Sequence, residues 1–139
     1  MAVQTEAPDK KTILEQVKVI AVVGLSRRES RPGYYVPAYM YKAGYRIIPV
    51  NPYLQETFGE KAYPDLLSIP EPVDMVVIFR RSEDVPPVVD EAIEIGAKVV
   101  WMQLGIVNEE AAAKARAAGL QVIMNSCVMV DHQRLFGGF

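Results

Sequence analysis

The fold is decided by residues 19–32, which read VIAVVGLSRRESRP. The first five residues are a β-branched, apolar run, typical of a strand buried on both faces. Gly24 then permits a tight turn, and Pro32 is the residue type favoured at the first position of a helix. The free N–H groups and the dipole of such a helix start attract anions. Because Arg27 and Arg31 add cationic donors, the stretch predicts a phosphate-binding pocket.

Composition limits the class of protein. The chain has 139 residues and a net charge of −2, which argues against a general nucleic-acid binder. Its single cysteine cannot form an intrachain disulfide, no Cys/His spacing is typical of a metal site, and no apolar run approaches the ~20 residues of a membrane span. Residues 1–11 lack the apolar core of a signal peptide. We expect one cytoplasmic domain over residues 1–139, with residues 1–10 as a candidate disordered segment, and no membrane or nucleic-acid partner.

Strand and helix patterns alternate along the whole chain. Strands are predicted at 19–23, 45–50, 74–79, 98–102 and 120–124, and helices at 10–16, 32–43, 82–95 and 109–118. Ser82 and Asn108 are expected to cap the last two helices, and Pro64–Ser68 to form one helical turn. The pattern predicts an α/β fold: a doubly wound, Rossmann-like, parallel five-stranded sheet in the order 3-2-1-4-5, with helices on both faces.

Ligands in such sheets bind outside the carboxyl ends of the strands, beside strand 1. NAD(P) is the default ligand, but residues 24–29 do not match G-x-G-x-x-G. The second strand ends in Asn51-Pro52, where an NAD site normally carries an acidic residue for the ribose. The chain also lacks the G-x-x-x-x-G-K-[ST] pattern of a P-loop. A ligand with more phosphate charge than NAD fits the arginines better.

Five segments in the same order resemble the small stand-alone CoA-binding domain proteins. They are residues 23–32, 44–52 (GYRIIPVNP), 77–82 (VIFRRS), 100–105 (VWMQLG) and 125–127 (NSC). These proteins are similar in fold to the N-terminal CoA-binding domain of the succinyl-CoA synthetase alpha subunit. The resemblance covers about residues 11–135, which is most of the chain.

The resemblance implies that coenzyme A, or an acyl-CoA, binds at the carboxyl ends of the strands. The resemblance implies that the ligand meets Ser26, Arg27, Asn51, Pro52, Phe79, Arg80, Arg81, Met102, Gln103 and Leu104. The loop after the first strand adds Gly24, Leu25 and Arg31 to the predicted cofactor-binding residues. The arginines on two loops suit the 3′-phosphate and diphosphate of the ligand. Gln103 offers an amide that can bind adenine or a pantetheine-like group.

The sequence departs from its relatives in two respects. Gly33 stands where relatives often have alanine or a small hydroxyl residue. The second half of the synthetase, with its phosphorylated histidine, is absent, and His132 is the only histidine. The ligase reaction is therefore not implied, and no convincing catalytic constellation is visible. We expect binding without catalysis.

Several residues have more than one interpretation. Arg28 could meet phosphate or pair with Glu29 or Glu60, and Arg80 and Arg81 could instead pair with the nearby Glu83 and Asp84. Cys127 could form a mixed disulfide with CoA, act as a redox sensor or be a small buried apolar residue.

Other side chains point to packing. Trp101 is expected in the core, His132 beside Asp131 in a structural or surface position, and one of Tyr34 and Tyr35 could touch the ligand. The apolar segment 135–139 could pack on the domain, dock a second subunit or be disordered.

Two further classes of function stay open. One is an enzyme, either a nucleotide-dependent oxidoreductase of the NAD(P) type or a small acyl-CoA transferase. The other is a module that senses CoA for an unidentified protein partner. Fold alone does not choose among them.

Overall fold

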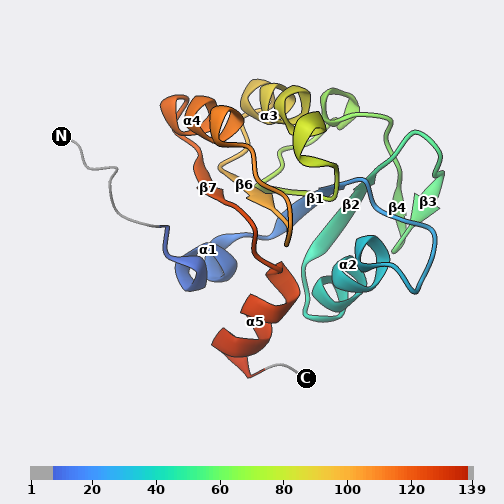
Figure 1. The fold of residues 1–139 in the computed structure, drawn as a ribbon. Coiled ribbons are helices and arrows are strands. Elements are labelled where there is room, and N and C mark those ends of the chain that lie inside the picture. The colour runs from blue at the N-terminus through green and yellow to red at the C-terminus, as the bar shows by residue number, and fades with distance from the viewer. Residues whose placement is uncertain (1–7, 138–139) are drawn as a thin grey trace.

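The computed structural model describes residues 8–137 (Figure 1). Its strands are β1 (Val19–Val23), β2 (Arg46–Val50), β3 (Glu56–Thr57), β4 (Glu60–Lys61), β5 (Met75–Ile78), β6 (Val99–Met102) and β7 (Gln121–Ile123). Its α-helices are α1 (Lys10–Gln16), α2 (Pro32–Lys42), α3 (Val85–Glu94), α4 (Glu109–Ala117) and α5 (Val128–Phe136). Two 3-10 helices, η1 (Leu66–Ser68) and η2 (Ser82–Asp84), complete the described part.

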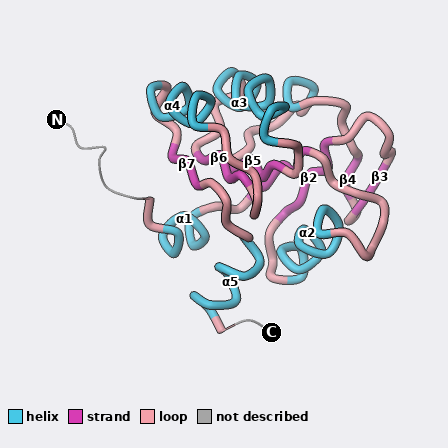
Figure 2. The backbone as a smooth tube through the Cα atoms, viewed as in Figure 1, coloured by secondary structure: helices cyan, strands magenta, loops and turns pink. Residues whose placement is uncertain are grey.

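The main sheet has five parallel strands in the order β2-β1-β5-β6-β7. β1 lies in its interior, and Val23 pairs with Val50 on one side and Ile78 on the other. Figure 2 shows α3 and α4 on one face of the sheet and α1, α2 and α5 on the other. The predicted Rossmann-like α/β class is therefore confirmed.

The predicted strand order 3-2-1-4-5 is wrong. The third strand of the main sheet, β5, lies against β1 and not outside β2, which makes the order 2-1-3-4-5. The connection from β2 packs Leu66, Ile69 and Val73 on the same face as α3. A right-handed crossover on that face carries the chain past β1, whereas α2, on the opposite face, carries it from β1 to β2. The order thus follows from the face that residues 51–74 cover.

Asp74 fixes this arrangement at the start of β5. Its Oδ2 accepts hydrogen bonds from the backbone N–H groups of Lys18, at 3.0 Å, and Val19, at 2.9 Å. Its own backbone N–H donates to the Val19 carbonyl at 3.0 Å. These bonds tie the start of β5 to the start of β1.

Two apolar cores lie on the two faces of the sheet. Side chains of β1, β5 and β6 alternate between them, as strand geometry requires. Trp101 lies in the core under α1, α2 and α5, is fully buried, and donates through Nε1 to the Ser126 carbonyl at 2.8 Å. Its predicted core role is confirmed. Met102, one residue later, points into the opposite core.

Several local predictions hold and several do not. Asn108 caps α4 by accepting from the Ala111 N–H at 2.9 Å, as predicted, but Ser82 is not a side-chain cap. It begins η2, and its Oγ accepts from the Val107 N–H at 3.0 Å. The predicted turn at 64–68 appears as η1. The β3–β4 hairpin and α5 were not predicted from the sequence.

The two ends of the chain meet the predictions only in part. Asp9 caps α1 by accepting from the Lys11 N–H at 3.0 Å, so Lys10 is helical, while residues 1–7 of the candidate disordered segment lie outside the described residues. Leu135 and Phe136 belong to α5, and residues 138–139 lie outside the described part. Across residues 8–137, no helix is both long and apolar enough to cross a bilayer.

A candidate ligand cleft at the carboxyl end of the sheet

Gly24 begins the site directly after β1. Its φ of +89° belongs to the region that favours glycine, and a Cβ built on it would lie 2.6 Å from the Phe79 carbonyl oxygen. Its N–H donates to the Val50 carbonyl at 2.9 Å. The absence of a side chain therefore allows the ends of three neighbouring strands to approach one another.

The loop from β1 to α2 closes on itself. The Ser26 N–H donates to the Gly33 carbonyl at 3.0 Å, and its Oγ accepts from the Arg28 N–H at 3.0 Å. A Cβ at Gly33 would lie 3.3 Å from the Gly24 oxygen and from the Ser26 Cβ. The first turn of α2 thus packs closely against this loop, and a larger residue at this position would press on it.

Asn51 joins the exits of β1 and β2. Its Nδ2 donates to the Leu25 carbonyl at 2.8 Å, and its Oδ1 accepts from the Tyr53 N–H at 2.8 Å. The side chain that replaces the acidic residue of an NAD site therefore holds two loops together. Each of its polar ends makes one hydrogen bond within the protein.

A cationic hollow of about 370 Å³ lies over these loops, and we call it the arginine lobe. It is lined by Gly24, Leu25, Ser26, Arg27, Arg28, Arg31, Asn51 and Tyr53. All three arginines are exposed, and none forms an ion pair with any residue between 8 and 137. Glu60, one partner considered for Arg28, is bound by Arg46 at 2.7 Å. The lobe therefore carries positive charge that the described chain does not neutralise.

The two arginines after β5 behave differently from each other. Arg81 donates to Asp84 at 3.1 Å and lies 3.6 Å from Glu83, so it makes the local pairs that the sequence left open. These contacts raise the pKa of the Arg81 guanidinium, the hydrogen bond to Asp84 most of all. Arg80 is half-buried, and its Nε is buried without a hydrogen-bond partner among the described residues.

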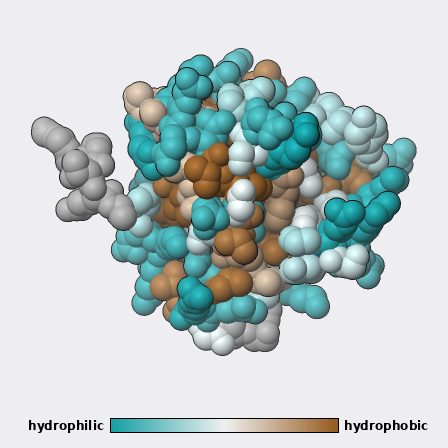
Figure 3. Space-filling model, viewed as in Figure 1, coloured by the Kyte–Doolittle hydropathy of each residue, from teal (hydrophilic) through white to brown (hydrophobic). Residues whose placement is uncertain are grey.

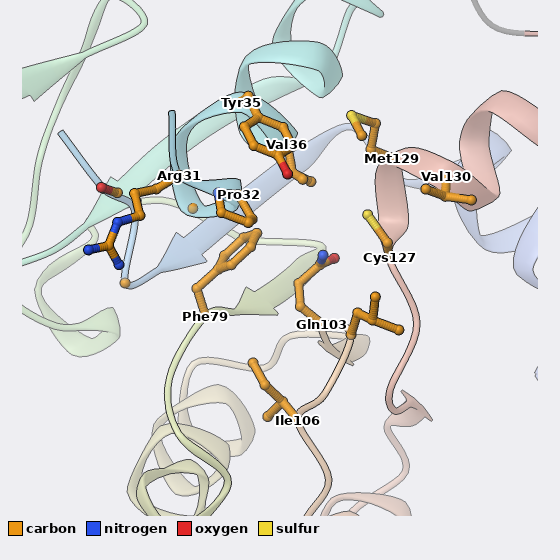
Figure 4. A pocket seen from close by; sticks show the side chains of 14 residues that line it. Arg31, Pro32, Tyr35, Val36, Phe79, Gln103, Ile106, Cys127, Met129 and Val130 are labelled. Carbon is orange, nitrogen blue, oxygen red and sulfur yellow. The ribbon is translucent and has the colours of Figure 1, made fainter. Parts of the chain in front are cut away.

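A second, mostly apolar cleft of about 480 Å³ adjoins the first, and we call it the apolar lobe (Figure 4). It is lined by Gly24, Ser26, Arg31, Pro32, Gly33, Tyr35, Val36, Phe79, Gln103, Leu104, Ile106, Cys127, Met129 and Val130. The two lobes share Gly24, Ser26 and Arg31. Figure 3 shows apolar side chains gathered near the centre of the view, between α3 and α4 on one side and α5 on the other.

The structure separates the predicted site residues into three groups. Those that line one or both lobes are Gly24, Leu25, Ser26, Arg27, Arg31, Asn51, Phe79 and Gln103. Pro52, Arg80 and Arg81 lie on neighbouring loops and line neither lobe. Met102 is fully buried in the core and lines neither lobe, and Leu25 is also fully buried although it contributes to the floor of the arginine lobe.

The apolar wall was largely missed by sequence reasoning. Met129 and Val130 belong to α5, which has no side-chain cap to mark its start. Its apolar periodicity is weak in the sequence, because two of the three residues that it buries at helical spacing, Asp131 and His132, are polar. Tyr35 does line the cleft, one of the two tyrosines considered at the start of α2.

Beneath α5, His132 and Asp131 have separate partners. The His132 Nδ1 lies 2.9 Å from the Tyr39 hydroxyl, and burial lowers the pKa of the imidazole. Asp131 pairs with Lys10 at 3.1 Å and accepts a hydrogen bond from Ser126. The two side chains therefore connect α5 to different helices, which is a structural arrangement.

These observations define a Rossmann-like parallel α/β protein with a cationic cleft and an adjoining apolar cleft at the carboxyl end of its sheet. A family model described as "CoA binding domain" matches residues 18–133. The chain belongs to this family.

Similar proteins include both stand-alone and much longer chains. The uncharacterized protein YneT of Bacillus subtilis (strain 168) is 48% identical over 122 residues, which are 88% of this chain and 90% of that protein. The solved structure of a hypothetical protein from Pyrococcus horikoshii OT3 is 37% identical, with a TM-score of 0.89 and coverage of 98% of this chain and 100% of the other. An ADP-forming acetate–CoA ligase II of Archaeoglobus fulgidus is 36% identical over 83 residues, which are 58% of this chain but 12% of the ligase.

Proposed function

We propose that this chain binds coenzyme A or an acyl-CoA across the two lobes, without catalysis of its own. The observation that carries the proposal is the cluster Arg27, Arg28 and Arg31, which has no acidic partner among residues 8–137 and lies beside an apolar cleft. The 3′-phosphate and diphosphate of the ligand match the arginines, and its pantetheine arm matches the apolar lobe. The family and the similarity to a segment of an acetate–CoA ligase support this choice of ligand.

The absence of catalysis is supported by the chemistry of the cleft. Within the described chain, the lining of the two lobes contains no carboxylate, histidine or lysine to act as a general base. Cys127 is the one nucleophilic thiol there, and it is the only cysteine in the chain. A single cysteine and the phosphate-rich ligand are also in keeping with a cytoplasmic site of action.

An NAD(P)-dependent enzyme is the alternative, and Asn51 disfavours it. An NAD site uses an acidic side chain after the second strand to bind the ribose. Here both polar ends of the Asn51 side chain are already bonded to backbone groups of Leu25 and Tyr53. Ribose hydroxyls donate to the two oxygens of a carboxylate, whereas Asn51 has no charge and a single acceptor oxygen, which already accepts from the Tyr53 N–H.

Equilibrium titration with three ligands tests the proposal. CoA is expected to bind with an affinity of about micromolar, since two or three charge-assisted hydrogen bonds must offset the ordering costs. Dephospho-CoA should bind several-fold more weakly because it lacks the 3′-phosphate, and NAD should bind more weakly still. Preference for NAD, or no binding of any of the three, would overturn the proposal.

A further inference from the structure

Gln103 is a buried amide whose two ends have different surroundings. It directly follows β6, and only 3% of its surface is exposed. Its Oε1 accepts a hydrogen bond from the Val128 N–H, at the start of α5, at 2.9 Å. A backbone N–H can be satisfied only by an acceptor, so this bond fixes the oxygen toward Val128 and the nitrogen away from it.

The Gln103 Nε2 group has no hydrogen-bond partner among residues 8–137. Figure 4 shows the amide reaching into the apolar lobe between Phe79 and Cys127. This nitrogen is accessible from the cleft that Gln103 lines, so it can donate to an acceptor on a bound ligand without giving up a bond within the protein. The surrounding wall is apolar, so the acceptor that fits is a neutral carbonyl oxygen and not a phosphate.

We propose that Gln103 is a specificity-determining residue that donates, through Nε2, to a carbonyl oxygen of the ligand's acylated or free pantetheine arm. The inference rests on the proposed function and assigns the arm to the apolar lobe. Arg31 is the one cation among the described residues that line this lobe, and it lies at the wall shared with the arginine lobe. The phosphates therefore belong at the shared wall and in the arginine lobe, and the neutral arm extends past Phe79 to Gln103.

The carbonyl has two chemical sources. CoA carries amide carbonyls within the arm, and an acyl-CoA adds a thioester carbonyl at its end. Beyond Gln103 the wall consists of Cys127, Met129 and Val130, which offer an apolar environment to an acyl group. Comparing CoA with butyryl-CoA distinguishes the two sources.

The test measures the affinity of Gln103 variants for ligands that have or lack the pantetheine arm. Gln103→Glu keeps an oxygen to accept from the Val128 N–H but replaces the donor with an acceptor, and Gln103→Met removes the donor without adding charge. The ligands are CoA, butyryl-CoA and adenosine 3′,5′-bisphosphate, which lacks the pantetheine arm. Gln121→Glu is the matched control, because it makes the same charge change at an exposed position at the start of β7.

Both Gln103 variants are expected to lose about tenfold in CoA affinity and no more than about twofold in affinity for the bisphosphate. Gln121→Glu should change neither by more than about twofold. An additional loss with butyryl-CoA would identify the thioester carbonyl, and an equal loss the amide carbonyl. Equal losses for CoA and the bisphosphate, or no loss for either, would overturn the inference while leaving CoA binding intact. A wild-type protein that binds none of the three ligands would overturn the proposed function as well.

Discussion

Arg46 at the amino end of the sheet and the arginines of the β1–α2 loop at the carboxyl end differ in whether they have acidic partners. At the amino end, where β2 begins, Arg46 donates to Glu60 at 2.7 Å and 3.1 Å and to Glu71 at 2.7 Å. These carboxylates raise the pKa of the Arg46 guanidinium, and Arg46 lowers the pKa of Glu60. At the carboxyl end, the arginines of the β1–α2 loop make no ion pair with a described residue.

This difference distinguishes a cation that is paired within the protein from cations that are available to bind a ligand. The chain has 17 acidic and 15 basic residues, so acidic partners are not scarce. Arg46, although exposed, is paired with two of them, Glu60 and Glu71. Three unpaired arginines beside a turn that glycine allows to be tight are, by contrast, arranged for an anion from outside the chain.

The largest expected effect on stability concerns Gly24 and Gly44, which both have a positive φ but lie at opposite ends of the sheet. Gly24→Ala should lower the free energy of unfolding by about 3–4 kcal/mol, because its Cβ would meet the Phe79 carbonyl in addition to the strain of a positive φ. Gly44→Ala, with φ +108° and nothing within 4 Å of the added Cβ, should cost about 1 kcal/mol. Urea unfolding measures both. Equal losses would show that the close approach at Gly24 is not a constraint.

Next comes the loss of the unpaired cations. Replacing Arg27, Arg28 and Arg31 together by glutamine should weaken CoA binding about 100-fold and leave the melting temperature almost unchanged, because these side chains are exposed and unpaired. Calorimetric titration and thermal melting supply the two readouts. Unchanged affinity would remove the arginine lobe from the site.

The reciprocal change at the amino end should affect stability alone. Arg46→Met is expected to cost about 1 kcal/mol at pH 7 and leave CoA affinity unchanged, since it breaks a surface ion-pair network. Glu60 has a lowered pKa in the folded state, so its contribution is present above its unfolded pKa of about 4.3 and is lost as the pH falls through the folded value. The stability difference between wild type and variant should therefore shrink below about pH 4.

A matched control for Arg46 is Lys114→Met, which breaks a single exposed pair with Asp90 at 2.6 Å. Its cost should be smaller, at most about 0.5 kcal/mol. A loss as large as that of Arg46→Met would mean that the paired network at the amino end has no special weight.

The smallest effect concerns His132, away from both ends. Burial lowers the pKa of this histidine, the only one in the chain, in the folded state. The unfolded state, with a histidine pKa of about 6.5, therefore binds more protons than the folded state just below that pH. Stability should decline as the pH falls through this window, by less than about 1 kcal/mol, and then level off below the folded pKa. In His132→Gln this decline should vanish. A decline that persists in the variant would assign the pH dependence to other groups.

The sheet, its strands and the position of the cleft were predictable because hydrophobic periodicity, glycines at helix ends and helix caps are local signals in the sequence. Gly24, Ser26 and Arg31 were identified in this way, and they line both lobes. The strand order was not predictable locally, because it depends on which face residues 51–74 cover. The apolar wall from α5 was missed for a similar reason: an uncapped helix gives a weak local signal, and its place beside the cleft comes from tertiary packing.

In the proposed complex, the unpaired arginine loop holds the phosphates of CoA and the apolar lobe holds its pantetheine arm. A crystal structure of the protein with CoA would show where both parts of the ligand lie. We expect phosphate oxygens within hydrogen-bonding distance of the residues from Ser26 to Arg31 and a ligand carbonyl within reach of the Gln103 Nε2. Phosphates bound elsewhere, with the arm directed away from Gln103 into solvent, would refute this placement.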